Sequence, residues 1–96
     1  MHPALEFEKI EVALPKGSLW VREQTALELV ELRELPEGSE YYYEALVRSV
    51  LDADGNRVFQ SIDEAKNTSG RTAIKLREAF DTVNGYNLDD EKKAIA

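Results

Sequence analysis

The segment from Asp52 to Phe59, with the sequence DADGNRVF, contains the residue types and spacing that most resemble a chemical site. Asp52, Asp54 and Asn56 place oxygen-bearing side chains at alternate positions, which is how an EF-hand loop supplies its first calcium ligands. Asp63 falls at the twelfth position of such a loop. A small calcium-binding module that uses the loop from Asp52 to Asp63 is therefore one hypothesis for the function.

The same loop departs from the EF-hand pattern at two positions. The sixth position needs glycine for a sharp bend, and this chain has Arg57 there, a bulky cation. The glutamate that binds calcium through both oxygens is one position late, at Glu64. We therefore favour a reverse turn, in which Asp52, Asp54 and Gly55 form the bend. No metal or cofactor is assigned to the chain.

Side chains for covalent or acid-base catalysis are scarce. The chain of 96 residues has no cysteine, and its one histidine is His2, next to the terminus. Thiolate catalysis, cysteine-ligated zinc and a histidine-based site therefore lack their residues. Carboxylates without a histidine or lysine partner carry little catalytic signal. We expect a protein that is not an enzyme, with no catalytic residues.

The charge of the chain is negative and unevenly distributed. The formal net charge is −7, and residues 1–47 hold 4 basic residues against 10 acidic ones. An acidic chain repels phosphate, so nucleic acid and anionic membrane are poor partners. No window approaches the ~18 apolar residues of a membrane-spanning helix, and no signal peptide is visible. The acidic front half leaves open a second alternative, an inhibitor that binds a basic protein.

The aromatic residues Tyr41, Tyr42, Tyr43 and Trp20 are the candidates for a contact surface. Adjacent residues of a helix point about 100° apart, so the three tyrosines cannot all face one core. We expect Tyr43 to pack inward, and Tyr41 or Tyr42 is a possible interface residue. Trp20 is more simply a core residue, with recognition as the alternative.

The pattern of apolar residues predicts a β-hairpin at the N-terminus. Residues 5–14 alternate between apolar and polar with one slip at Glu8 and Lys9, which suggests a strand with a bulge. Residues 15–17 (PKG) are typical of a turn, and residues 19–23 (LWVRE) alternate again. The predicted hairpin occupies residues 1–24.

Three main helices are expected after the hairpin. Thr25 and Glu28 match the capping-box pattern before a helix over residues 26–35, whose apolar face would hold Leu27, Leu29, Val30, Leu32 and Leu35. A second helix is predicted over residues 40–51 with Ser39 as its N-cap. A third is predicted over residues 71–83, closed by an Asn84-Gly85 cap.

These elements predict one domain of the α+β class, mainly α-helical with an N-terminal β-hairpin. A single helical turn after Ser61 connects the second and third helices. Residues 25–85 form the helical part, and residues 86–96 are a charged tail. The short segment Val58-Phe59 makes an apolar return after the bend.

The order of these features resembles the tail assembly chaperones of long-tailed bacteriophages and prophages. The resemblance rests on three segments: the strand LWVRE at residues 19–23, the segment LVRSVLDADGNRVF at residues 46–59, and the NGY that follows the last helix at residues 84–86. It covers nearly the whole chain.

The resemblance implies a non-enzymatic factor of tail morphogenesis, in the short form that some of these phages accompany with a frameshifted longer one. Such a protein would bind the tape measure protein, help to recruit tail tube subunits and associate with itself. It would act in the cytoplasm of the bacterial host and be absent from the mature virion. In this resemblance, Asp52, Asp54 and Gly55 are turn-forming positions, not site residues, and Phe59 is implied as the packing residue.

Overall fold

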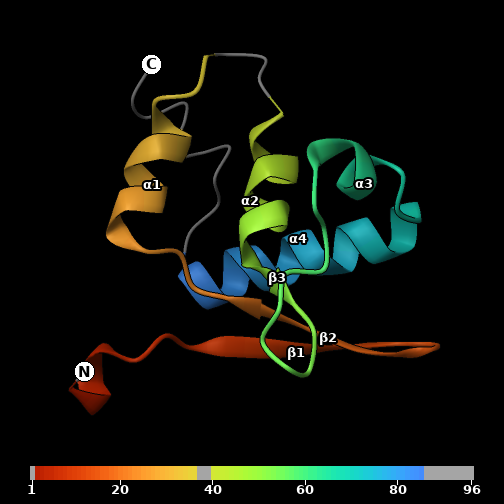
Figure 1. Ribbon diagram of the computed structural model, residues 1–96, viewed down its shortest axis with the longest axis horizontal. Coiled ribbons are helices and arrows are strands. Elements are labelled where there is room, and N and C mark those ends of the chain that lie inside the picture. Colours follow the sequence, from red (N-terminus) through yellow and green to blue (C-terminus); the bar gives the residue numbers. More distant parts are fainter. Residues whose placement is uncertain (1, 37–39, 86–96) are drawn as a thin grey trace.

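The computed structural model describes residues 2–36 and 40–85, and within them the fold is α+β and mainly helical (Figure 1). The first two strands form the N-terminal β-hairpin, as predicted. In chain order the elements are a short 3₁₀ turn η1 (Pro3–Leu5), β1 (Lys9–Leu14), β2 (Gly17–Arg22), α1 (Ala26–Arg33), α2 (Tyr41–Ser49), β3 (Val50–Leu51), α3 (Ile62–Lys66) and α4 (Gly70–Asn84).

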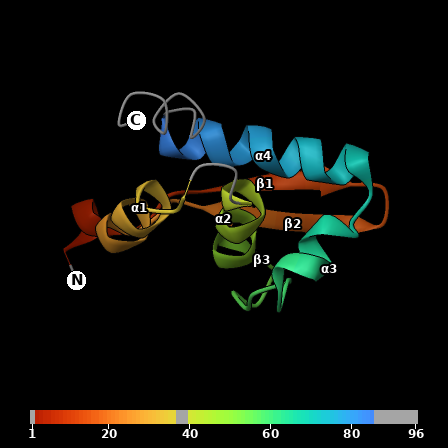
Figure 2. The same ribbon diagram turned by 90° about the horizontal axis from the view of Figure 1, so that it is seen from above.

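The sheet is antiparallel, with the strand order β1-β2-β3. Ile10 faces Val21 and Leu14 faces Gly17, so Pro15 and Lys16 alone make the hairpin turn. Side chains alternate between the two faces of a strand, and the buried residues Val12 and Val21 lie on the face that α4 covers. Figure 2 shows α4 lying along this face of the hairpin.

The first strand is shorter than the apolar alternation predicted. It begins at Lys9, and no bulge interrupts it. The chain before it forms η1, where Leu5 is 67% exposed, and then an extended arm with Phe7 49% exposed. β2 ends at Arg22, so within the described part of the chain the residues before Glu8 have no neighbouring strand to bond with. An extended segment without a partner is not a strand, whatever its sequence pattern.

The second predicted helix ends two residues early because its last two residues form a strand. α2 ends at Ser49, and Val50 and Leu51 pair with Val21 and Trp20 of β2. The chain then turns through residues 52–57, and Val58 donates its N–H to the Val50 carbonyl at 3.1 Å. The predicted N-cap Ser39 lies outside the described residues.

The predicted caps of the other helices are confirmed. Thr25 and Glu28 form a capping box at the start of α1. The Ser61 hydroxyl accepts the Glu64 N–H at 3.2 Å, which begins α3. α4 ends at Asn84 and is capped by Gly85, whose φ of 74° is the left-handed conformation that glycine adopts most easily. α1 itself stops at Arg33, because Pro36 restricts the residue before it. The predicted charged tail, residues 86–96, lies outside the described part of the chain.

The core lies where α2 and α4 meet the sheet. Its fully buried side chains include Phe80 and Leu76 of α4, Leu46 of α2 and Leu32 of α1. Phe59, which follows the turn, is 6% exposed and joins the same cluster, as predicted. Close packing of these side chains from every main element supplies most of the stability of a domain of this size.

Candidate functional site

The segment DADGN is a hydrogen-bonded turn. The Asp52 Oδ1 accepts the N–H of Asp54 at 2.9 Å and the N–H of Asn56 at 3.0 Å. The Asp52 N–H donates to the Asn56 carbonyl at 2.9 Å, so the backbone closes the turn as well. Gly55 has a φ of 84°, which supplies the bend. The Asp52 carboxylate therefore caps its own loop.

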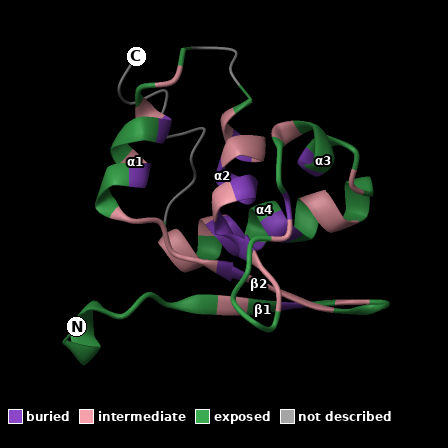
Figure 3. Ribbon diagram, viewed as in Figure 1, coloured by how far each residue is buried: buried purple, intermediate pink, exposed green. Residues whose placement is uncertain are grey.

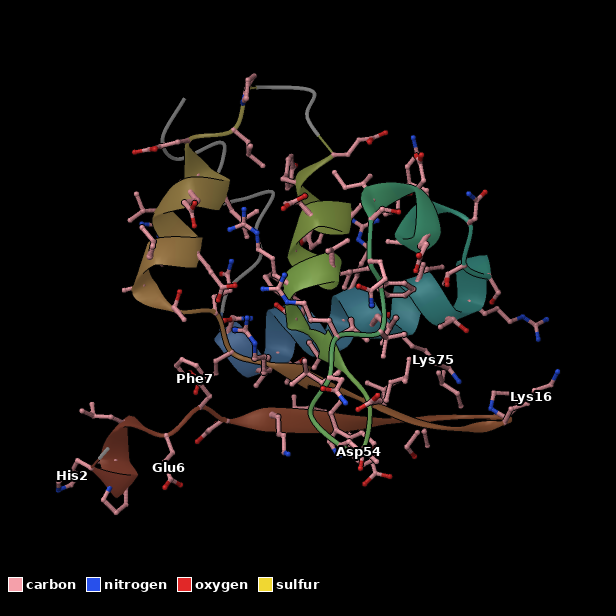
Figure 4. All side chains as sticks on the ribbon, viewed as in Figure 1. His2, Glu6, Phe7, Lys16, Asp54 and Lys75 are labelled. Carbon is pink, nitrogen blue, oxygen red and sulfur yellow. The ribbon has the colours of Figure 1, made fainter. Side chains whose placement is uncertain are left out.

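This geometry differs from that of a calcium loop. The bend is at Gly55, two positions before Arg57, where the EF-hand bend would lie. Asp54 is exposed at the tip of the turn (Figure 4). In residues 2–36 and 40–85 no three acidic, histidine or cysteine side chains gather as metal ligands would. The turn hypothesis accounts for each of these observations. The calcium hypothesis can be tested separately by calorimetry.

The tyrosine that packs inward is Tyr42, whereas the sequence suggested Tyr43. Tyr42 is 7% exposed, and its hydroxyl donates to the two Asp81 oxygens at 2.9 and 3.2 Å. The Arg77 guanidinium lies 4.0 Å from the ring centroid of Tyr42, a cation-π distance. Phe80 contacts the ring edge-on at 6.3 Å. Tyr42 therefore joins α2 to α4 and is not accessible to a partner in this fold.

The sequence alone could not show which tyrosine packs inward, because the position of α4 decides which side of α2 is covered. Tyr41 and Tyr43 are both half-buried and pack at the margin of the core. Trp20 is also half-buried, on the face of the sheet opposite Val21, between Glu11 and Leu51 on the neighbouring strands. Tyr41 and Trp20 thus keep partly accessible surface, and Tyr42 has almost none.

One ion pair connects three elements at the junction of the hairpin and the helices. The Arg22 guanidinium donates to both Glu28 oxygens, at 2.8 and 2.9 Å. It also donates to the Arg48 carbonyl at 2.9 Å, near the end of α2. The side chains of Arg22 and Glu28 are only 15% and 12% exposed. Bidentate pairs of this kind fix orientation as well as charge.

The ionisation of Glu28 follows from these contacts. Burial opposes the charged form, but the hydrogen bonds from Arg22 and Thr25 outweigh it and lower the pKa of Glu28 to about 2. The carboxylate is therefore charged at neutral pH, and its oxygens are occupied by these hydrogen bonds. A general acid or base needs a pKa near the working pH. The lowered pKa of Glu28 therefore indicates a structural role.

Two exposed apolar side chains lie next to each other on the surface of α1. Leu27 is 67% exposed and Val30 is 47% exposed. They share one side of the helix with the exposed residues Glu31 and Glu34, since positions three, four and seven apart lie together. We refer to Leu27, Val30, Glu31 and Glu34 as the acidic α1 stripe. Figure 3 shows that the outer side of α1 is exposed over most of its length.

The predicted apolar face of this helix is only partly buried. Leu32 is fully buried, and Leu29 and Leu35 are half-buried. Leu27 and Val30 point away from the core, contrary to the prediction. α1 lies at one end of the molecule, and the other labelled elements of the described chain lie to one side of it (Figure 1). A short helix with apolar residues around much of its circumference then leaves some of them exposed.

The fold and these surfaces define a small α+β protein with accessible apolar side chains on an acidic background. Comparison with protein-family models, with curated proteins and with solved structures gave no match. Among the described residues, none of the helices has the length and apolar character needed to cross a membrane.

Sequence reasoning missed the residues that join the elements. In the sequence, Arg22 has the pattern of an ordinary polar residue of a strand, and Asp81 that of a polar residue of a helix. Glu28 had a signal, its place in the capping box, but that signal does not reveal that the same carboxylate also binds Arg22. Asn84 was expected only as part of a helix cap, yet its side-chain oxygen accepts the Gln24 N–H at 2.9 Å.

Proposed function

We propose that this protein is a non-enzymatic tail assembly chaperone of a long-tailed phage or prophage, and that it binds a helical segment of the tape measure protein. The observation that carries the proposal is the acidic α1 stripe, where Leu27 and Val30 are exposed on a short, well-capped helix. The order of sequence features described above supports the same function. Recruitment of tail tube subunits and action in the host cytoplasm belong to the same proposal.

The shape of the stripe favours a helix as its occupant. Apolar residues three apart on a helix form a ridge that packs against an amphipathic partner helix. A holding chaperone must cover apolar surface of its client without precipitating, and a net charge of −7 keeps such a complex soluble.

The charge of the stripe favours a partner with basic residues beside its apolar ones. Glu34 is exposed, and the Glu31 side chain is 48% exposed although it also pairs with Arg48 at 3.2 Å. Opposite charges at the rim of an interface steer association and fix its register. We therefore expect a client helix whose apolar stripe is flanked by lysine or arginine.

Co-expression with fragments of a tape measure protein tests the proposal. The wild-type chain should keep an otherwise insoluble fragment in solution and co-purify with it. The double variant L27Q/V30Q should lose most of this activity, because it removes the apolar contacts and keeps good helix-forming residues. Soluble fragment and bound fragment are measured by gel densitometry after clarification and affinity capture.

The matched control is Ile74→Gln. Ile74 is 58% exposed on α4, away from the stripe, so this change removes a comparable apolar side chain from another surface. It should leave the rescue intact. A wild-type chain that rescues no fragment, or an L27Q/V30Q variant that rescues as well as wild type, would contradict the proposal.

The acidic-inhibitor alternative makes a different prediction about salt. Binding to a basic protein through charge alone weakens steeply as salt is added, because exposed charges are screened beyond about 10 Å at 0.1 M. Binding carried mainly by Leu27 and Val30 should weaken only modestly with salt, through screening of the rim charges of Glu31 and Glu34. A steep loss of affinity, together with insensitivity to L27Q/V30Q, would favour the inhibitor.

A further inference from the structure

The outer edge of β1 is open. Within the described residues, β1 pairs only with β2, and the sheet continues on the other side of β2 to β3. Figure 1 shows α4 above one face of the hairpin, and Figure 2 shows that it runs alongside β1. An unpaired edge presents backbone N–H and C=O groups that can bind another strand.

The hydrogen-bonding pattern of the hairpin shows which backbone groups lie on this edge. Ladder hydrogen bonds alternate along an antiparallel strand, and the Glu23 N–H donates to the Glu8 carbonyl at 2.9 Å. Even-numbered residues of β1 therefore direct their backbone groups to β2. The odd-numbered residues Lys9, Glu11 and Ala13 direct theirs to the open edge.

We propose that β1 pairs antiparallel with β1 of a second copy of this chain, centred on Val12, so that two sheets join into one. In this register Ile10 faces Leu14 of the second copy and Val12 faces Val12. Glu11 faces Ala13, and both have their backbone groups on the edge, where they can exchange hydrogen bonds. On the α4 side of the joined sheet, the apolar side chains of residues 10, 12 and 14 would then continue from one copy to the other.

Other registers are less favourable. Residues that face each other across a pair lie on the same side of the sheet, so the register can shift only in steps that preserve this parity. Centring the pair on Glu11 would set two like charges directly opposite each other, which is destabilising. Centring it on Ile10 would set Glu8 against Val12, which is 8% exposed and belongs to the core.

The Val12 register also brings together opposite charges that have no partner within one chain. Continued one residue before β1 and into the hairpin turn, it brings Glu8 near Lys16 of the second copy, and Lys16 near Glu8. Both residues are exposed, and neither forms an ion pair in the part of the chain that the structure describes. Lys16 lies at the tip of the hairpin, free of other elements (Figure 4). Two symmetric ion pairs would therefore flank the joined strands.

Charge reversal at these two positions tests the register. Sedimentation equilibrium should show a reversible dimer for wild type, with E8K and K16E each about tenfold weaker, because each sets two like-charge pairs across the interface. The double variant E8K/K16E should restore the wild-type affinity. An equal mixture of E8K and K16E should form a heterodimer as tight as wild type.

This design separates a specific pair from general repulsion. E8K reduces the magnitude of the net charge of −7, so general repulsion alone would make this variant dimerise more tightly than wild type. Weaker dimerisation of E8K, with rescue in the double variant, follows only from a local contact with Lys16.

A proline substitution tests the edge itself. Ala13 is exposed and its N–H points to the open edge, so Ala13→Pro removes a donor from the dimer without removing one from the hairpin. The dimer should be lost while the circular dichroism of the monomer is kept. The matched control Ala13→Thr retains the N–H and should still dimerise.

Two results would overturn this inference. One is a protein that remains monomeric at all accessible concentrations. The other is a dimer that A13P, E8K and K16E leave unchanged, which would place the contact elsewhere. Neither result bears on the acidic α1 stripe, because α1 lies at one end of the molecule and is a different element from the β1 edge (Figure 1), so the two proposals fail separately.

Discussion

Arg22 and Glu28 form a bidentate ion pair, with N–O distances of 2.8 and 2.9 Å, at the point where β2 leads into α1. The same guanidinium donates to the carbonyls of Glu23 and Arg48, at 2.7 and 2.9 Å. One side chain thus fixes the end of the hairpin, the start of α1 and the end of α2 relative to one another.

Replacing Glu28 with glutamine should destabilise the protein by about 2 kcal/mol, since it removes a charged hydrogen-bond partner and leaves a half-buried guanidinium incompletely paired. Urea unfolding followed by circular dichroism measures the change. Glu31→Gln is the control, because its pair with Arg48 is more exposed, and it should cost less than about 0.5 kcal/mol. Equal losses of stability in the two variants would show that the Arg22–Glu28 pair contributes no more than the exposed Glu31–Arg48 pair.

The stability should also depend on pH through Glu28. Its pKa is about 2 in the folded protein and near 4.5 when the contacts are absent. A lowered pKa means that the contribution is complete above about pH 4.5 and is lost as the pH falls toward 2. Wild type should therefore lose stability over this range more steeply than E28Q. Parallel pH profiles for the two proteins would contradict the assignment.

Tyr42→Phe should destabilise the protein by about 1 kcal/mol, because the Asp81 carboxylate loses the hydroxyl that it accepts from. The ring, and with it the contact to Arg77, is retained. Tyr43→Phe is the control, since Tyr43 is half-buried and no hydrogen bond of its hydroxyl is seen among the described residues. Thermal unfolding compares the two. A Tyr43→Phe variant as unstable as Tyr42→Phe would argue against the packing of α2 on α4.

Two glycine-to-alanine substitutions should change stability in opposite directions. An added Cβ meets no atom within 4 Å at either Gly55 or Gly70. Gly55 has a φ of 84°, which strains alanine, whereas Gly70 begins α4 with no such restriction. G55A should therefore cost about 1 kcal/mol, and G70A should stabilise by about 0.5 kcal/mol. Urea midpoints measure both. A stable G55A variant would show that the turn can adopt another conformation.

Asp52→Ala should destabilise the turn by about 1 kcal/mol in the absence of any metal, because two backbone N–H groups lose their acceptor. Asp54→Ala should have little effect on stability, since the Asp54 side chain is exposed. Calcium added during isothermal titration calorimetry should give no stoichiometric heat. Heat that appears with wild type and disappears with Asp54→Ala would instead establish the calcium-binding module.

Local sequence signals predicted the local structure. The capping box at Thr25, the Ser61 cap, the Asn84-Gly85 end of α4 and the hairpin turn each depend on residues within a few positions of one another. Hydrogen bonds and backbone preferences at this range are encoded in short segments. The α+β class, with its N-terminal hairpin, followed from the same signals.

The exact ends of the first strand and the second helix depended on distant residues. The alternation runs from Leu5 to Leu14 with one slip at Glu8 and Lys9, but only Lys9 onward has β2 beside it. Val50 and Leu51 fit a helical pattern, and the open positions beside Val21 and Trp20 make them a strand. A strand is defined by its neighbour, so no reading of a single segment could have found these limits.

The sequence by itself determined the hairpin, the main helices, the caps outside residues 37–39, the acidic balance and the turn at DADGN, because these follow from composition and short-range chemistry. Only the tertiary structure decided that Tyr42 is buried and Leu27 exposed, that Arg22 binds Glu28, and that β1 has a free edge. The physical reason is that burial and pairing depend on which elements lie beside one another in space. Adjacent tyrosines of one helix, or leucines of another, differ only in what the rest of the chain places against them.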